Sequence, residues 1–233
     1  MPHLKNQPPI LQYLLTVVLI ILGTILVKAL IVWTAEVFLH PIPVVGGWLK
    51  SLEIVELSNV VVFAVLGFSL AMATVHLPPR LALWQKSLAL AIAIPLVFLS
   101  SYWVRQTLWL YQVAASSSVS YQQATSVANQ ALKTVSGSDG FWGFFSSTTQ
   151  MPLLPTTVAD IQRLSDDQKW FRSELTRFSG LQPGLFSLVF SGAGWGLRLF
   201  QLALATLTGI IYFSKGLTWA DAERLRRLAS GKS

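Results

Sequence analysis

The sequence contains no cysteine, and this absence excludes several kinds of site. Disulfide bonds, thiolate metal sites and cysteine nucleophiles all need a thiol. The three histidines, His3, His40 and His76, are scattered and do not have the spacing of metal ligands. We therefore expect no metal and no cofactor, and cysteine usage does not identify a redox compartment.

Charge is also scarce, because only 12% of the residues are charged whereas 53% are hydrophobic. A soluble domain usually has about 25% charged residues. Such a chain cannot cover a water-facing surface, so we expect lipid to surround much of it. The net charge of +7 indicates membrane topology and contact with anionic lipid. Nucleic acid is not an expected partner, since the basic residues form no stripe with interleaved aromatic residues.

Catalytic motifs are missing as well. The sequence shows no clustered histidines and no carboxylate pair placed for general acid–base catalysis. The segment 137–140 has glycines at its ends but not the Gly-x-Ser-x-Gly pattern of a nucleophile elbow. The segment 230–233 resembles the end of a phosphate-binding loop but lacks its earlier glycine. We therefore expect that the protein is not an enzyme, and a membrane-embedded enzyme is the remaining alternative.

Four apolar runs are present, and a membrane-spanning helix needs about 20 apolar residues. The runs are Ile10 to Leu39, Leu57 to Leu77, a third that begins near Leu81 and is apolar from Leu88 to Trp103, and Leu185 to Phe213. They predict an all-α integral membrane protein with four transmembrane helices. A cleavable signal peptide is the alternative for the first run. Its apolar core exceeds the usual length of 7–15 residues, so a span is favoured.

Lysine and arginine in short loops decide the orientation of a membrane protein. The N-terminus, the connection after the second span and the C-terminus carry most of these residues. We therefore expect both termini in the cytoplasm of a multi-pass protein of a bacterial inner membrane or an internal membrane. The predicted parts are a cytoplasmic N-terminus (1–9), three transmembrane helices (10–104), an external helical hairpin domain (105–182), the fourth transmembrane helix (183–214) and a basic cytoplasmic tail (215–233).

The external hairpin is predicted from helix signals between the third and fourth spans. No glycine or proline occurs between Leu96 and Ser136, so we expect the third span to continue as a helical stalk. Three consecutive serines, 116–118, are its weak point because their hydroxyls compete for backbone hydrogen bonds. Gly137 and Gly140 end the stalk. Thr157 and Asp160 have the spacing of a capping box for a second helix, with apolar positions up to Phe178.

Four aromatic residues cluster between the two helices of this hairpin: Phe141, Trp142, Phe144 and Phe145. In water they would form an exposed apolar patch, which usually marks an interaction site. They are predicted to touch a bilayer or to contact a partner protein. An alternative is that they fold back on their own domain.

The last part of the chain is expected to leave the membrane. Residues 214–216 are predicted to end the fourth span, and Thr218 to cap a new short helix. Its arginines and its apolar face predict a basic helix that rests on the anionic cytoplasmic leaflet.

Charged residues inside spans are costly and are functional candidates. Arg198 lies about midway in the fourth span, and Lys28 and Glu36 lie in the first. We expect Arg198 to pair with Glu36 or to bind an anionic group; a plain interhelical ion pair or a lipid-phosphate contact is the alternative. Lys28 is expected to extend its amine to the membrane surface.

Three glycines precede Arg198, at Gly192, Gly194 and Gly196. Small residues allow transmembrane helices to pack closely. Their spacing of two also allows an unwound stretch that lines a binding site, whereas ordinary packing is the alternative.

These features favour a non-enzymatic subunit, scaffold or assembly factor of a larger membrane complex, with the lipid bilayer and other proteins as partners. A small transporter or channel component that uses Arg198 and Glu36 is the alternative. The scarcity of polar residues in the second and third spans weighs against that alternative, because little is left to line a path.

Overall fold

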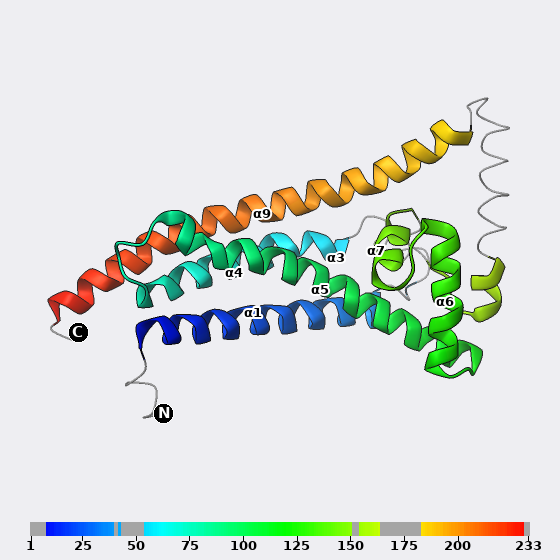
Figure 1. Ribbon diagram of the computed structural model, residues 1–233, viewed down its shortest axis with the longest axis horizontal. Coiled ribbons are helices and arrows are strands. Elements are labelled where there is room, and N and C mark those ends of the chain that lie inside the picture. Colours follow the sequence, from blue (N-terminus) through cyan, green and yellow to red (C-terminus); the bar gives the residue numbers. More distant parts are fainter. Residues whose placement is uncertain (1–7, 40–41, 43–53, 151–153, 164–182, 231–233) are drawn as a thin grey trace. The chain divides into compact units, whose positions relative to one another are not determined.

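The computed structural model describes residues 8–39, 42, 54–150, 154–163 and 183–230, and every regular element in them is helical (Figure 1). This confirms the predicted all-α fold for the described residues. In chain order the elements are α1 (Pro9–Thr34), the π-helix η2 (Ala35–Leu39), α3 (Ile54–Leu57), α4 (Asn59–Ala73), the 3-10 helix η3 (Thr74–His76), α5 (Leu83–Ser117), α6 (Tyr121–Ser136), α7 (Gly140–Gln150), a turn of helix at 158–163 and α9 (Pro183–Ala229).

Four stretches of helix are long and apolar enough to cross a membrane, as predicted. They are Pro9–Leu39, Val55–His76, Leu83–Ser117 and Gly192–Ala229. The first two agree closely with the apolar runs of the sequence, and the third continues as helix beyond its run to Ser117. The fourth is longer than expected, because α9 continues without a break through residues 214–216.

The predicted end of the fourth span and the new helix start at Thr218 are therefore wrong as helix boundaries. The Thr218 hydroxyl donates a hydrogen bond to the Lys215 carbonyl at 2.7 Å, inside the helix, and does not cap a helix start. Gly216 lies where α9 meets α4. A Cβ built on it would lie 2.7 Å from the Ala71 Cβ, so the glycine allows close packing and does not end the helix.

The described helices carry large exposed aliphatic side chains, and their largely apolar core also holds buried charges. Leu26 is 62% exposed and Val61 is 68% exposed, although both lie in apolar spans. Lysine, glutamate and arginine are almost never fully buried in soluble proteins unless they are paired. Here Lys28, Glu56 and Arg198 are all buried to 1% exposure or less.

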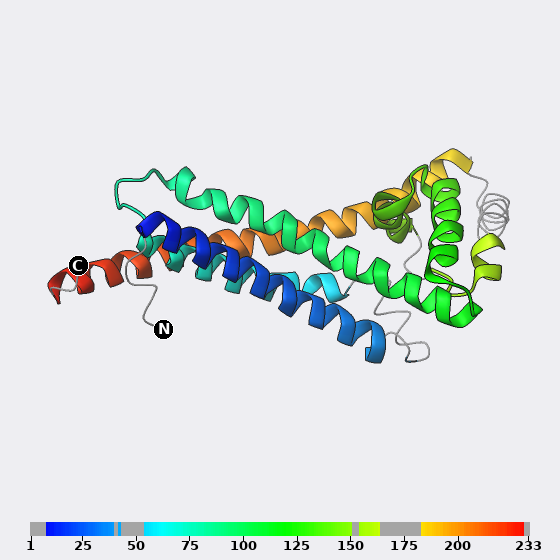
Figure 2. The same cartoon turned by 60° about the horizontal axis from the view of Figure 1, so that its bottom comes forward.

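The chain divides into two compact units. Unit 1 comprises residues 1–30, 56–101 and 201–233, and unit 2 comprises residues 31–55 and 102–200. The helices α1, α5 and α9 contribute residues to both units. In unit 1 the corresponding parts of α1, α4, α5 and α9 run alongside one another (Figures 1 and 2).

Glycine at two positions allows α4 and α9 to approach each other in unit 1. A Cβ built on Gly67 would lie 2.2 Å from the Gly209 carbonyl oxygen, which is closer than any side chain tolerates. A Cβ on Gly209 would in turn lie 3.3 Å from the Phe63 carbonyl oxygen. Small residues at such a crossing let the two helix backbones approach closely.

In unit 2, helix α5 ends within the run of three serines that was predicted as the weak point of the stalk. Helix α5 ends at Ser117, and Ser118 adopts φ +53°, a conformation that a helix does not contain. Ser120 then starts α6 with a capping box, because its hydroxyl accepts from the Gln123 amide. The expectation of one unbroken stalk is therefore wrong: the chain forms two helices, α5 and α6, with a break at residues 118–120 (Figure 1).

The remaining helix boundaries of unit 2 agree with the sequence. Gly137 ends α6 in the left-handed conformation at φ +78°, and α7 begins at Gly140 and packs against α6. The Thr157 hydroxyl accepts from the Asp160 amide at 3.2 Å, which confirms the predicted helix start. The predicted continuation of this helix to Phe178 lies outside the described residues.

Candidate functional site

A cluster of buried polar side chains in unit 1 joins residues of four helices, α1, α3, α4 and α5. Lys28 of α1 places its amine 3.7 Å from a carboxylate oxygen of Glu56, which lies in α3. The same amine donates to the Ser58 hydroxyl at 3.1 Å. The Asn59 amide nitrogen donates to Glu56 at 2.7 Å, and the Ser101 hydroxyl of α5 lies 3.1 Å from the other carboxylate oxygen. The cluster thus links the first three spans.

The position of Lys28 corrects a prediction. Its side chain is fully buried, so it does not extend to a surface. The negative carboxylate of Glu56 and the Ser58 hydroxyl surround the amine and compensate for the water that it lacks. A buried charge with such partners is stable, whereas the same charge without them is strongly destabilising.

A second buried ion pair lies in unit 2. Arg105 Nε of α5 lies 3.3 Å from Glu36 Oε1, and both side chains are buried. Glu36 belongs to the π-helix η2, a type of turn that is rare and often occurs at functional sites. The structure thus pairs Glu36 with Arg105, whereas its pairing with Arg198 stays a prediction.

The space beside this pair is small. The cavity that Glu36 and Arg105 line together with Trp109 and Thr148 has a volume of about 10 Å³. A single water molecule needs about 10–15 Å³. The cavity therefore holds one water molecule at most, and it is too small for a solute.

Arg198 packs against α7 within unit 2. One guanidinium nitrogen donates to the Phe145 carbonyl at 2.6 Å, and the other donates to the Thr148 hydroxyl at 3.2 Å. The guanidinium carbon lies 4.5 Å from the ring centre of Tyr102 and 4.8 Å from that of Phe145. These contacts join α9, α7 and α5, so Arg198 acts here as a structural crosslink whose charge is stabilised by aromatic rings.

The four aromatic residues of the predicted tip lie in α7 and differ in exposure. Phe144 is buried and its ring centre lies 5.6 Å from that of Trp109. Phe145 is half-buried against Tyr102, at a ring distance of 4.7 Å, and Phe141 is half-buried too. Only Trp142 of the four is largely exposed, at 61%. The alternative that the cluster folds back on its own domain thus holds for Phe144, and Trp142 is the residue left for contact with a bilayer or a partner.

The three glycines before Arg198 are all helical. Helix α9 is continuous through Gly192, Gly194 and Gly196, so the predicted unwound stretch is absent there. A Cβ built on Gly194 would lie 2.0 Å from the Thr149 carbonyl oxygen, which places this glycine at a close contact with α7. A Cβ on either of the other two would meet no described atom within 4 Å. Of the three, only Gly194 packs closely here.

Sequence reasoning missed both partners of the buried ion pairs. Glu56 directly precedes the second apolar run, and Arg105 is the first residue of the predicted external domain, so neither stands out as a charge inside a span. A signal existed, because Glu56 and Asn59 are three residues apart and Ser101 and Arg105 are four apart. Such spacings place polar residues on one helical face, and a polar face at the end of a span indicates a partner on a neighbouring helix.

Comparison with protein-family models, with curated protein sequences and with solved structures finds no match for the chain.

Proposed function

We propose that the chain is an integral membrane protein with four transmembrane helices, and that it serves as a non-enzymatic subunit, scaffold or assembly factor of a larger membrane complex. Both termini lie in the cytoplasm in this proposal, and residues 105–182 lie on the other side of the membrane. The four apolar helices and their exposed aliphatic side chains support the membrane location.

One observation carries the structural role: the buried charges hold helices together. Lys28 and Glu56 connect α1 with α3, and Glu36 and Arg105 connect η2 with α5. Side chains that are engaged in this way are not available to carry a solute along a path. This is also why the alternative, a small transporter or channel component based on Arg198 and Glu36, has less support.

Trp142 supports a contact with another protein. The residue is exposed beside a buried aromatic cluster, and a tryptophan anchored in this way is a common centre of protein interfaces. In the proposed topology α7 lies outside the membrane, so lipid does not cover this side chain. A partner protein is then the surface that buries it.

The test is to purify a C-terminally tagged chain in a gentle detergent and to measure the mass of the intact complex by native mass spectrometry. We expect companions at a fixed stoichiometry, and we expect Trp142→Ala to lose them. Trp84→Ala is the matched control, because Trp84 is 67% exposed at the start of α5. A lone monomer or homo-oligomer of the wild-type chain would contradict the proposal, and so would equal loss from both variants.

A further inference from the structure

The part of α9 that follows its apolar stretch forms an open groove with the end of α4. The groove has a volume of about 600 Å³, and all of its lining residues belong to unit 1. Its apolar side is made by Met72, Trp219 and Ala222, and its charged side by Glu223, Arg226 and Arg227. A second hollow of about 500 Å³ shares these three charged residues and adds Ser230. The two arginines therefore lie between an apolar groove and a polar hollow.

Arg224 does not line the groove but contacts the end of the second apolar helix. Its guanidinium donates to the carbonyl oxygens of Thr74 and Leu77, at the end of α4 and η3. Helix ends leave such carbonyls without helical partners, and a cation there is favourable. Arg224 thus attaches α9 to the end of α4 and leaves Arg226 and Arg227 exposed at the groove.

The charges of the groove favour an anion. Arg227 Nε lies 3.1 Å from Glu223 Oε1, so the one carboxylate in the lining is already engaged. The two arginines exceed it by one positive charge. Guanidinium groups bind phosphate oxygens through paired hydrogen bonds, which makes a phosphate group the natural anion for this site.

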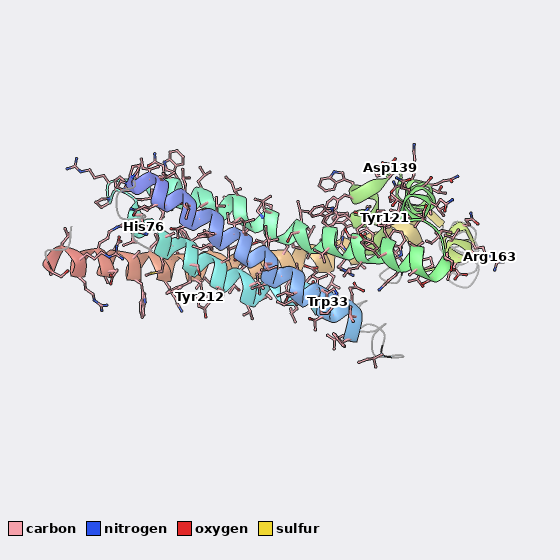
Figure 3. All side chains as sticks on the ribbon, turned by 90° about the horizontal axis from the view of Figure 1, so that it is seen from below. Trp33, His76, Tyr121, Asp139, Arg163 and Tyr212 are labelled. Carbon is pink, nitrogen blue, oxygen red and sulfur yellow. The ribbon has the colours of Figure 1, made fainter. Side chains whose placement is uncertain are left out.

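The location of the groove favours a lipid as the source of that phosphate. Trp219 is 65% exposed at the groove and stacks edge-on against Phe68 at a ring distance of 6.2 Å. Tryptophan concentrates at the boundary between membrane and water. Figure 3 labels His76 at the end of η3, where the second apolar helix ends, and Tyr212, which precedes Trp219 in α9 and is 41% exposed. In a membrane, the groove would lie at headgroup level beside apolar surface.

We propose that this groove binds the headgroup of an anionic phospholipid, with the phosphate at Arg226 and Arg227 and an acyl chain along Met72 and Trp219. This inference rests on the membrane location in the proposed function. It assigns a specific lipid site to residues that composition alone would treat as a general basic surface.

The test is a titration of the purified full chain with phosphatidylglycerol, which is anionic, and with phosphatidylcholine, which is neutral overall, read by native mass spectrometry. We expect preferential binding of phosphatidylglycerol. The double variant Arg226→Gln/Arg227→Gln should bind it about thirtyfold more weakly, because each basic residue near an anionic lipid contributes roughly a factor of five. The variant Glu223→Gln should bind it more tightly, since it releases Arg227; a folding defect would not produce this gain.

The matched control is Arg80→Gln/Lys86→Gln, which removes the same charge from unit 1 at residues that do not line the groove. Unchanged binding by this control supports the site, whereas equal weakening in both double variants would overturn it. Equal binding of the two lipids, or displacement of phosphatidylglycerol by inorganic phosphate at equal concentration, would also overturn it. Loss of a protein companion from the groove variant without loss of lipid would identify the groove as a protein contact and contradict the proposal.

A separate measurement distinguishes this inference from the proposed function. If an alkaline carbonate wash releases the wild-type chain from membranes, the membrane location itself fails. If the chain stays in the membrane and the groove variant binds phosphatidylglycerol as the wild type does, only the lipid site fails.

Discussion

Single buried charges in this protein are stable because each has an opposite charge or aromatic rings beside it. Removing an ion from water costs several kcal/mol even after the protein relaxes. The ion pair with Glu56 and the hydrogen bond to Ser58 offset this cost for Lys28. For Arg198, a hydrogen bond to a backbone carbonyl and contacts with the rings of Tyr102 and Phe145 offset it. The buried ions thus specify which helices meet.

Replacing one member of the Lys28–Glu56 pair should therefore destabilise the fold. We expect Lys28→Met to lower the free energy of unfolding by about 3–5 kcal/mol, because it removes the Lys28 amine from beside the buried Glu56 carboxylate. The double variant Lys28→Met/Glu56→Gln should recover most of this loss. Unfolding in mixed detergent micelles measures both values.

Lys86→Met is the control for this pair, because Lys86 is half-exposed and takes part in no described ion pair. Its effect should stay within about 0.5 kcal/mol. If the double variant loses as much stability as the two single variants together, the two residues are not coupled and this part of the account is wrong.

The candidate charges could be predicted from the sequence, but their pairing could not. Lys28, Glu36 and Arg198 stand out because each interrupts an apolar run. Which charge meets which depends on how each helix is rotated, and the π-helix at Ala35–Leu39 changes that rotation for Glu36. The partner of each charge therefore depends on the neighbouring helix, which the local sequence does not identify.

At the scale of helices, close packing depends on glycines that differ from those singled out in the sequence. Gly67 and Gly209 lie alone in apolar runs, so no local pattern marks them, yet they bring α4 and α9 together. The three clustered glycines near Arg198 are conspicuous, but only Gly194 is at a close contact. Packing sites require knowledge of the neighbouring helix, which the sequence does not provide.

We expect Gly67→Ala to lower the free energy of unfolding by about 1–3 kcal/mol, because the added methyl group would overlap the Gly209 carbonyl. The matched control is Gly23→Ala in α1, where a Cβ would meet no described atom within 4 Å. That variant should be neutral or slightly stabilising, since alanine favours a helix by about 0.5–1 kcal/mol over glycine. Equal melting temperatures for the two variants in detergent would contradict the assigned helix crossing.

Helix boundaries were predictable where local chemistry sets them. The left-handed glycine at 137, the capping box at Ser120 and the cap at Thr157 each act within a few residues. The predicted break at 214–216 failed because the same residue types also occur inside a helix. Gly216 packs against α4, and this tertiary contact outweighs its low helix propensity.

For the molecule as a whole, the sequence predicts the number of apolar helices well, since each of the four runs is a long and strong local signal. The division into two units could not be predicted, because α1, α5 and α9 each contribute to both units and no linker marks the boundary. Domain boundaries at 105 and 182 were inferred from apolar content, whereas the units follow contacts between helices.

The topology is the central claim at this scale, and the absence of native cysteine makes it directly measurable. Single cysteines are introduced by Ser138→Cys, between α6 and α7, and by Ser230→Cys, just after α9; both serines are exposed. An impermeant maleimide on intact cells should label Ser138→Cys and leave Ser230→Cys unlabelled until the cells are permeabilised. Labelling of Ser230→Cys on intact cells, alone or together with Ser138→Cys, would contradict four spans with both termini in the cytoplasm.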